Sequence, residues 1–287
     1  MAEAPAVPDD ELGLGSAGVK LPVERPNFII GCARSGTSIL GEAIAAHPRV
    51  AYLFEASDLW NAALAEHDDD RLLAEDATDA ARSEARRRFE DAVAASPGDV
   101  LVEKNPKHVL RIPFLDAVFP DSRFVHILRD GRDVVASLMF RNRGSSWGHL
   151  KTPGWRDLLA RYPEANHMRC AYQWRDAVTA ARRDALELRL GPDRYREVRY
   201  EDLVQDPRRV MEGLLPFLGL DAHAAIDAFL PKIQDATERS YHARKQVRHY
   251  IENHSRRVGR YRENLTADQL RDVEEVCGPL LHELHYR

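Results

Sequence analysis

The 287-residue sequence predicts a three-layer α/β domain, in which helices flank both faces of a mostly parallel central sheet. Short apolar runs alternate along the chain with longer segments of helical periodicity, which is the pattern of β–α–β units. A chain of this length buries roughly 75% of the surface of its unfolded form, so it needs no disulfide to build a core. We assign residues 26–287 to a single domain. Residues 1–25 are rich in Ala, Pro, Gly and acidic residues and are expected to form a flexible N-terminal tail.

The predicted strands are short apolar runs bounded by turn residues. They cover residues 27–31, 50–54, 100–102, 123–128 and 195–199. Continuous apolar runs of this length are typical of strands that are buried on both faces. Ligands of such sheets bind at the carboxyl ends of the strands, so the residues that follow each run are the first candidates for a site.

The predicted helices follow the strands. They cover residues 37–47, 106–119, 130–141, 155–190, 207–218, 222–230 and 266–281, and residues 57–96 have helical character with a charged, solvated face. The first helix ends at His47 because the residue before a proline disfavours helical geometry. The last helix begins at Thr266, which is a typical N-terminal cap.

The composition excludes several classes of protein. The net charge of −5 argues against a nonspecific nucleic-acid binder, which needs a basic excess. The three cysteines are far apart and lack the spacing of a metal site, so reduced thiols are expected. No run of about 18 apolar residues predicts a membrane span, and residues 1–25 lack the apolar segment of a secretory signal. We therefore expect a cytoplasmic protein. Abundant Arg and Ala are typical of a GC-rich bacterial source.

The first strand leads into the segment GCARSGTS at residues 31–38, which predicts an anion site. A glycine-containing turn before a helix directs free backbone N–H groups and the positive end of the helix dipole at a ligand. Compared with the phosphate loop GxxxxGK[ST], Thr37 stands in place of the lysine and the cation is Arg34. The alternative is an ordinary turn between a strand and a helix.

A second candidate anion site follows the strand at residues 123–128, where the sequence continues RDGRDVVAS to Ser137. Arg129 ends the strand and Ser137 lies on the next helix. An arginine beside a serine can hold a phosphate through charge-assisted hydrogen bonds. The alternative is that residues 129–133 form only a charged turn with local ion pairs.

Together, residues 27–48 and 123–138 resemble the two phosphosulfate-binding elements of the sulfotransferases that use 3′-phosphoadenosine-5′-phosphosulfate (PAPS). The segments YEDL at 200–203 and VGRY at 258–261 extend the resemblance. Arg34 and Ile39 depart from the Lys and Trp of the cytosolic hormone- and phenol-sulfating branch. Arg34 and the Ala46-His47-Pro48 that ends the first helix are more similar to the tyrosylprotein and carbohydrate branches and their bacterial relatives. The resemblance implies a P-loop-like fold, PAPS as donor, 3′-phosphoadenosine-5′-phosphate (PAP) as product, and no metal.

The resemblance also implies roles for individual residues. The catalytic set is Glu55, Lys104, Arg34 and His108, with Glu55 as the general base, Lys104 and Arg34 beside the leaving group, and His108 as the rival base. The donor-binding set is Arg34, Ser35, Gly36, Thr37, Ser38, Arg129, Ser137, Tyr200 and Arg260. Without the resemblance, Glu55 is interpreted as a surface carboxylate or an ion-pair partner of Arg34, and Lys104 as a solvated charge at the end of a strand.

The acceptor is expected to be a small molecule or a glycan, meaning a carbohydrate, a glycolipid or a small natural product. Aromatic and polar residues between 142 and 169, including Trp147, His149 and Trp155, are candidates for the acceptor site. The alternative is that they serve only in packing. Two other functions remain open. The first is a nucleotide-dependent kinase, although this sequence lacks the loop lysine and the magnesium ligands that such a kinase needs. A non-catalytic protein that senses nucleotide or PAP needs only the anion sites.

Overall fold

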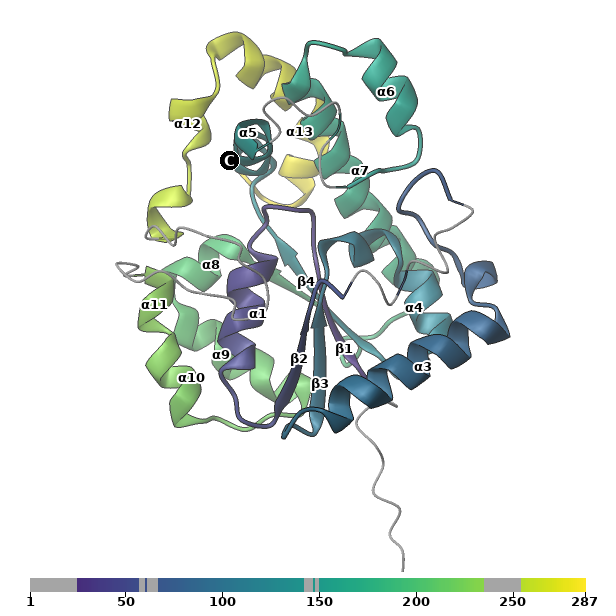
Figure 1. Cartoon of the computed structure of the whole chain (residues 1–287). Coiled ribbons are helices and arrows are strands. Elements are labelled where there is room, and N and C mark those ends of the chain that lie inside the picture. Colours follow the sequence, from purple (N-terminus) through teal and green to yellow (C-terminus); the bar gives the residue numbers. More distant parts are fainter. Residues whose placement is uncertain (1–24, 57–59, 61–66, 142–146, 148–149, 235–253) are drawn as a thin grey trace, which may run out of the picture.

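A parallel five-stranded sheet lies at the centre of the described residues, in the strand order β2-β3-β1-β4-β5. The computed structural model describes residues 25–56, 60, 67–141, 147, 150–234 and 254–287 (Figure 1). The strands are β1 Asn27–Ile30, β2 Val50–Phe54, β3 Val100–Lys104, β4 Arg123–Leu128 and β5 Tyr195–Arg199. The predicted fold class is confirmed, and the predicted bounds of β2, β4 and β5 are those observed.

The central strand β1 is buried along its whole length because both of its faces and both of its edges are covered. Phe28 pairs in register with Glu103 of β3 and with Phe124 of β4. Phe28 and Ile30 lie in one hydrophobic cluster, whereas Ile29 lies in the other. The alternation of side chains along a strand therefore divides the core into two apolar layers.

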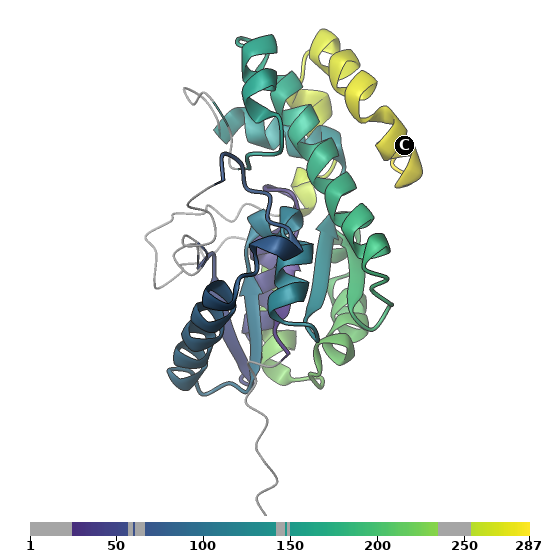
Figure 2. The ribbon, with the colours of Figure 1, turned by 90° about the vertical axis from the view of Figure 1, so that its right-hand side faces the viewer.

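One layer is formed by α3 Asp79–Ala94, α4 Ile112–Val118, α5 Gly131–Arg141, α7 Asn166–Glu187 and α13 Ala267–Glu283. The other layer is formed by α1 Thr37–Ala45, α8 Tyr200–Gln205, α9 Pro207–Leu218 and α10 Ala224–Phe229. The shorter elements are η3 Ala74–Asp76, η4 Pro106–Leu110, α6 Trp155–Arg161, α11 Pro231–Gln234, η5 His254–Arg257 and α12 Tyr261–Asn264. In both Figure 1 and Figure 2, α6, α12 and α13 lie beyond the carboxyl ends of the strands.

Several helices begin at side chains that accept a hydrogen bond from the first turn. Thr78 caps α3, Asp206 caps α9, and Thr266 caps α13 in a reciprocal arrangement with Gln269. Such caps satisfy backbone N–H groups that have no partner within the helix. The predicted start of the last helix at Thr266 is confirmed.

Two predicted helices are wrong because proline divides them. The segment 106–119 consists of η4 and α4, which meet at Arg111; Pro113 then lies in the first turn of α4, where a missing N–H is tolerated. The segment 155–190 consists of α6 and α7. Tyr162 precedes Pro163 and has the non-helical angles φ −128 and ψ 59, so the first helix ends there.

Some expectations fall outside the structure. Of the expected tail, only Arg25 is among the described residues. The segment 57–96, for which helical character is predicted, is described at residue 60 and from residue 67 onwards, where α3 covers residues 79–94. Within the described ranges, no helix combines the length and the apolar character needed to cross a bilayer. The carboxyl ends of β1 to β5 meet at one edge of the sheet, which is where the candidate residues lie.

Candidate active site

The segment after β1 forms a tight loop whose shape depends on Gly36. Its backbone has φ +102, which lies in the region that favours glycine. A Cβ atom at this position would lie 2.4 Å from Cδ2 of Tyr200. Ser35 closes the loop by donating its backbone N–H to Cys32 O over 3.0 Å. The Ser35 hydroxyl is buried and has no hydrogen-bond partner among the described residues.

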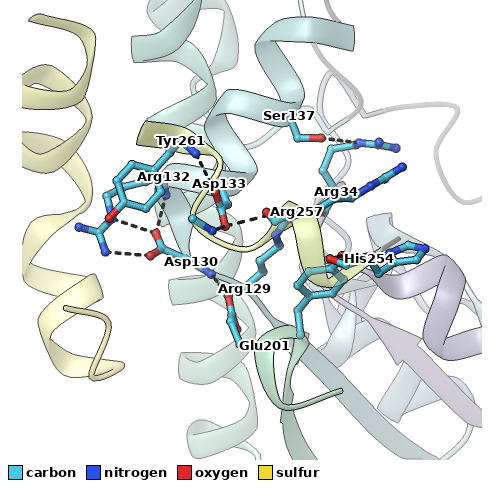
Figure 3. A network of polar contacts seen from close by, with 12 residues as sticks. Arg34, Arg129, Asp130, Arg132, Asp133, Ser137, Glu201, His254, Arg257 and Tyr261 are labelled. Atoms are coloured by element: carbon cyan, nitrogen blue, oxygen red, sulfur yellow. Dashed lines mark hydrogen bonds and ion pairs between the residues drawn. The ribbon is translucent and has the colours of Figure 1, made fainter. Parts of the chain in front are cut away.

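Arg34 joins this loop to helix α5. Its Nε donates to Ser137 Oγ over 3.1 Å, although the two residues are 103 positions apart. Figure 3 shows the Arg34 side chain directed at Ser137. The structure therefore brings together one residue of each anion element identified in the sequence.

Arg129, at the end of β4, is the most enclosed arginine of the site at 5% exposure. It donates through Nη1 to Arg34 O over 3.0 Å and through Nη2 to Arg257 O over 2.6 Å. Its guanidinium lies 4.4 Å from the ring centroid of Tyr200. Its Nε is buried and has no hydrogen-bond partner within the described part of the chain.

The buried His254 reports a positive potential in this region. Burial, and then the positive charges of Arg257, Arg129 and Arg34, together lower the pKa of His254 to about 3. His254 Nδ1 lies 2.9 Å from Tyr200 Oη, so the ring is both neutral and held in place. Three arginines from distant segments therefore act on one point, and such a point favours an anion.

Asp133 ties the segment 254–261 to α5 (Figure 3). Its Oδ2 accepts the backbone N–H of Gly259 over 2.8 Å, and its Oδ1 accepts that of Tyr261 over 2.9 Å. Nearby, Glu201 accepts the backbone N–H of Asp130 over 3.0 Å. From the sequence, Arg260 is placed in the donor-binding set, but Asp133 is given no role beyond a local ion pair. Its position four residues after Arg129 is the one local signal of a larger role.

Glu55 and Lys104 lie together at the ends of the neighbouring strands β2 and β3. Lys104 Nζ is 2.5 Å from Glu55 Oε1, and Glu55 N donates to Lys104 O over 2.8 Å. The ammonium also lies 3.6 Å from the ring centroid of Phe54. The Lys104 side chain is fully buried, whereas that of Glu55 is 39% exposed. The carboxylate is thus the half of the pair that an incoming molecule can reach.

His108 lies apart from this pair. It is fully buried in η4, with Nε2 3.1 Å from Glu103 Oε2. Glu103 also accepts the indole N–H of Trp60 over 3.0 Å. Burial lowers the pKa of His108, and the carboxylate of Glu103 opposes this effect. Because Glu103 and Lys104 are adjacent on a strand, their side chains point to opposite faces of the sheet.

The other candidate residues line the same edge. Thr37 is buried at the first position of α1 and Ser38 is half-buried beside it. Arg260 is half-buried between the two residues whose N–H groups bind Asp133. Among the aromatic residues considered for the acceptor, Trp147 and Trp155 are buried and pack together with ring centroids 5.5 Å apart. His149 lies outside the described residues.

Comparisons with known proteins identify the family of the chain. The family model described as "Sulfotransferase family" matches residues 26–224. Protein-tyrosine sulfotransferase 1 of Danio rerio is 25% identical over 211 residues, which are 69% of this chain and 54% of that protein. Omega-hydroxy-beta-dihydromenaquinone-9 sulfotransferase Stf3 of Mycobacterium tuberculosis is 28% identical over 207 residues, 69% of this chain and 44% of that protein. The chain spans about half the length of these curated relatives.

Solved structures show the same fold. The sulfotransferase domain from the curacin biosynthetic pathway aligns with a TM-score of 0.56 and 17% identity, over 89% of this chain and 97% of that one. Mouse sulfotransferase SULT7A1, solved as a complex with PAP, aligns with a TM-score of 0.54 and 14% identity, over 90% of this chain and 84% of that one. With the family model matching more than half of the sequence, the chain belongs to the sulfotransferase family.

Proposed function

We propose that this chain transfers a sulfuryl group from PAPS to an acceptor hydroxyl or amine and releases PAP. The observation that carries the proposal is that Arg129 donates to the backbone carbonyls of both Arg34 and Arg257, which brings three arginines of distant segments together. Two buried donors there, the Ser35 hydroxyl and Arg129 Nε, have no hydrogen-bond partner in the described part of the chain. Buried donors of this kind are normally satisfied, so the site is suited to a ligand with several anionic oxygens.

The two anionic ends of PAPS fit the two elements of the site. The 5′-phosphosulfate suits the loop of residues 34–38, where backbone N–H groups and the N-terminus of α1 face the ligand. The 3′-phosphate suits Arg129 and Ser137, with Arg260 from the adjoining segment. Tyr200, which closes against Gly36, lies between the two and suits a contact with the nucleotide.

Transfer requires a base for the acceptor and a cation for the leaving group. The acceptor oxygen or nitrogen forms a bond to sulfur as the bond from sulfur to the 5′-phosphate oxygen breaks, and Glu55 takes the acceptor proton. Lys104 and Arg34 stabilise the negative charge that develops on the released phosphate oxygen. We place the base at Glu55 rather than His108 because Glu55 is 39% exposed, whereas His108 is fully buried beside Glu103.

The acceptor class is the least constrained part of the proposal. The relatives are described by name as acting on protein tyrosine, on a hydroxylated menaquinone and on carbohydrates. For this chain we propose a carbohydrate, a glycolipid or a small natural product, sulfated in the cytoplasm by one domain formed from residues 26–287. The three cysteines are buried and are not joined in disulfides, which is compatible with a reducing compartment.

The direct test is a transfer assay with radiolabelled PAPS and pools of glycan and lipid acceptors, run with EDTA in place of magnesium. The expected result is a labelled product formed in proportion to released PAP. Consumption of ATP that depends on Mg²⁺, without use of PAPS, would show a kinase instead. Tight PAP binding with no transfer to any acceptor would show a binding protein.

A further inference from the structure

Asp133 holds two separate parts of the donor site in register, although it carries the wrong charge to bind an anion. Its side chain is fully buried in the first turn of α5. Both carboxylate oxygens are used by backbone N–H groups, those of Gly259 at 2.8 Å and Tyr261 at 2.9 Å. The guanidinium of Arg129 is more distant, with Nη2 3.7 Å from Oδ2. The shortest contacts of Asp133 are therefore with the backbone of another segment.

The segment 254–261 has three points of attachment. His254 contacts Tyr200 at one end, and Arg257 O accepts from Arg129 over 2.6 Å in the middle. Asp133 is the attachment at the other end. Gly259 has φ +75, a conformation that suits glycine and that turns two N–H groups towards the same carboxylate. Arg257 and Arg260 lie between these attachments.

We propose that Asp133 is a positioning residue for recognition of the 3′-phosphate: by clasping the backbone at Gly259 and Tyr261, it fixes the basic segment 256–260 against Arg129. This inference rests on the proposed use of PAPS. Asp133 does not touch the donor. It sets the distance between Arg129 and the arginines of the basic segment 256–260, so that Arg129 and this segment bind the same phosphate.

The direction in which PAP affinity changes when Asp133 is neutralised distinguishes this positioning role from simple charge balance. If Asp133 served only to offset the charge of Arg129, its neutralisation would strengthen the binding of an anion. If Asp133 positions the basic segment, Asp133→Asn weakens PAP binding even though it removes a negative charge. AMP lacks the 3′-phosphate, so its affinity should change far less.

The experiment is calorimetric titration of the full chain and its variants with PAP and with AMP. For Asp133→Asn we expect the PAP dissociation constant to rise by about tenfold or more, with the AMP constant within about twofold. Asp184→Asn is the matched control, because Asp184 is also fully buried in an ion pair, with Arg71, near the amino end of β5. It should leave the ratio of the two constants unchanged.

A second variant disturbs the same contact at Gly259, the residue that donates to Asp133. Gly259→Ala strains the left-handed backbone but leaves the Asp133 carboxylate beside Arg129. It should weaken PAP binding in the same direction, and faster amide exchange across 254–261 should accompany the loss. PAP binding that is unchanged or tighter in Asp133→Asn would overturn the inference, as would equal losses for PAP and AMP. If the wild-type chain itself does not bind PAP, the proposed function fails instead.

Discussion

The two halves of the site are built in opposite ways. The half proposed to bind the donor is a network of three segments. Arg129 and Asp133 are hydrogen-bonded to backbone groups of distant residues, and Arg34 donates to the hydroxyl of Ser137. The half that faces the acceptor is a single ion pair between Glu55 and Lys104 on neighbouring strands. The first half is buried and fixed by many contacts. The second presents a carboxylate that is 39% exposed. Under the proposed roles, the donor is held rigidly by the first half, while the carboxylate proposed as the base stays accessible.

The largest expected effect comes from removing the proposed base alone, which should greatly slow transfer without affecting donor binding. Glu55→Gln should lower kcat for transfer by about 10²–10⁴-fold, because an amide cannot take the acceptor proton. PAP affinity should stay within about twofold, because Glu55 is paired with Lys104 on the neighbouring strand and the substitution leaves Arg34 and Arg129 in place. A transfer assay at saturating PAPS, beside a PAP titration, measures both quantities.

Glu197→Gln is the control for this variant, since Glu197 is a strand carboxylate in an ion pair with Arg182 and is 30% exposed. It should transfer at the wild-type rate. Full activity in Glu55→Gln would contradict the assignment of the base and would return that role to His108 or to water.

The donor half should respond to the loss of geometry as well as charge. Arg129→Lys keeps the positive charge but cannot donate to Arg34 O and Arg257 O together. We expect the PAP dissociation constant to rise by about 10–100-fold, with a smaller change for AMP. Arg194→Lys, at an arginine that also joins a carboxylate to a backbone carbonyl, is the control and should bind PAP normally. Normal PAP binding in Arg129→Lys would mean that only a point charge is needed.

The close approach of Tyr200 to the loop can be tested with two glycines. Gly36→Ala combines a left-handed backbone with a Cβ atom 2.4 Å from the Tyr200 ring, so both strain and overpacking of about 1–3 kcal/mol apply. Gly154→Ala has a similar φ of +77 with no atom within 4 Å, so it carries strain alone. Thermal unfolding should show a fall in Tm of roughly 5 °C or more for Gly36→Ala and a smaller fall for Gly154→Ala. Equal falls would show that Tyr200 does not pack as described.

The smallest expected effect concerns the pH dependence of stability. The pKa of His254 falls from 6.5 to about 3 on folding, so between these values the unfolded chain binds a proton that the folded chain does not. The free energy of unfolding should therefore fall with falling pH, by at most about 1.4 kcal/mol per pH unit for this group. Arg34, Arg129 and Arg257 are the cations that face it.

In His254→Asn this contribution is absent, so chemical denaturation should show a shallower loss of stability below pH 6.5. His126, whose pKa is also lowered to about 3, is present in both proteins and cancels in the comparison. Parallel curves for the variant and the wild type would contradict the burial of a neutral His254 among three arginines.

The sequence was informative wherever a short segment determines its own structure. The strands at 50–54, 123–128 and 195–199 were predicted with the observed bounds, because each is an apolar run between turn residues. The helix predicted at 155–190 is divided, because Pro163 outweighs the helical periodicity around it. Arg34, Arg129 and Ser137 could be identified as candidates because each belongs to a local motif.

The remaining features of the site depend on tertiary contacts. Gly259 and Tyr261 bind Asp133 across 126 and 128 positions of sequence through backbone N–H groups, which every residue except proline carries. No residue type marks such a contact. The ion pair of Glu55 and Lys104 likewise follows from the pairing of β2 with β3, and the burial of His108 follows from the packing of Trp60 and Glu103 around it.

The central claim is that the donor half of the site binds the 3′-phosphate of PAPS. Its most direct test is calorimetric titration of the wild-type chain with PAP, AMP and ATP in the absence of magnesium. We predict micromolar binding of PAP and much weaker binding of AMP and ATP. Binding of ATP that appears only with Mg²⁺, together with no binding of PAP, would contradict the account.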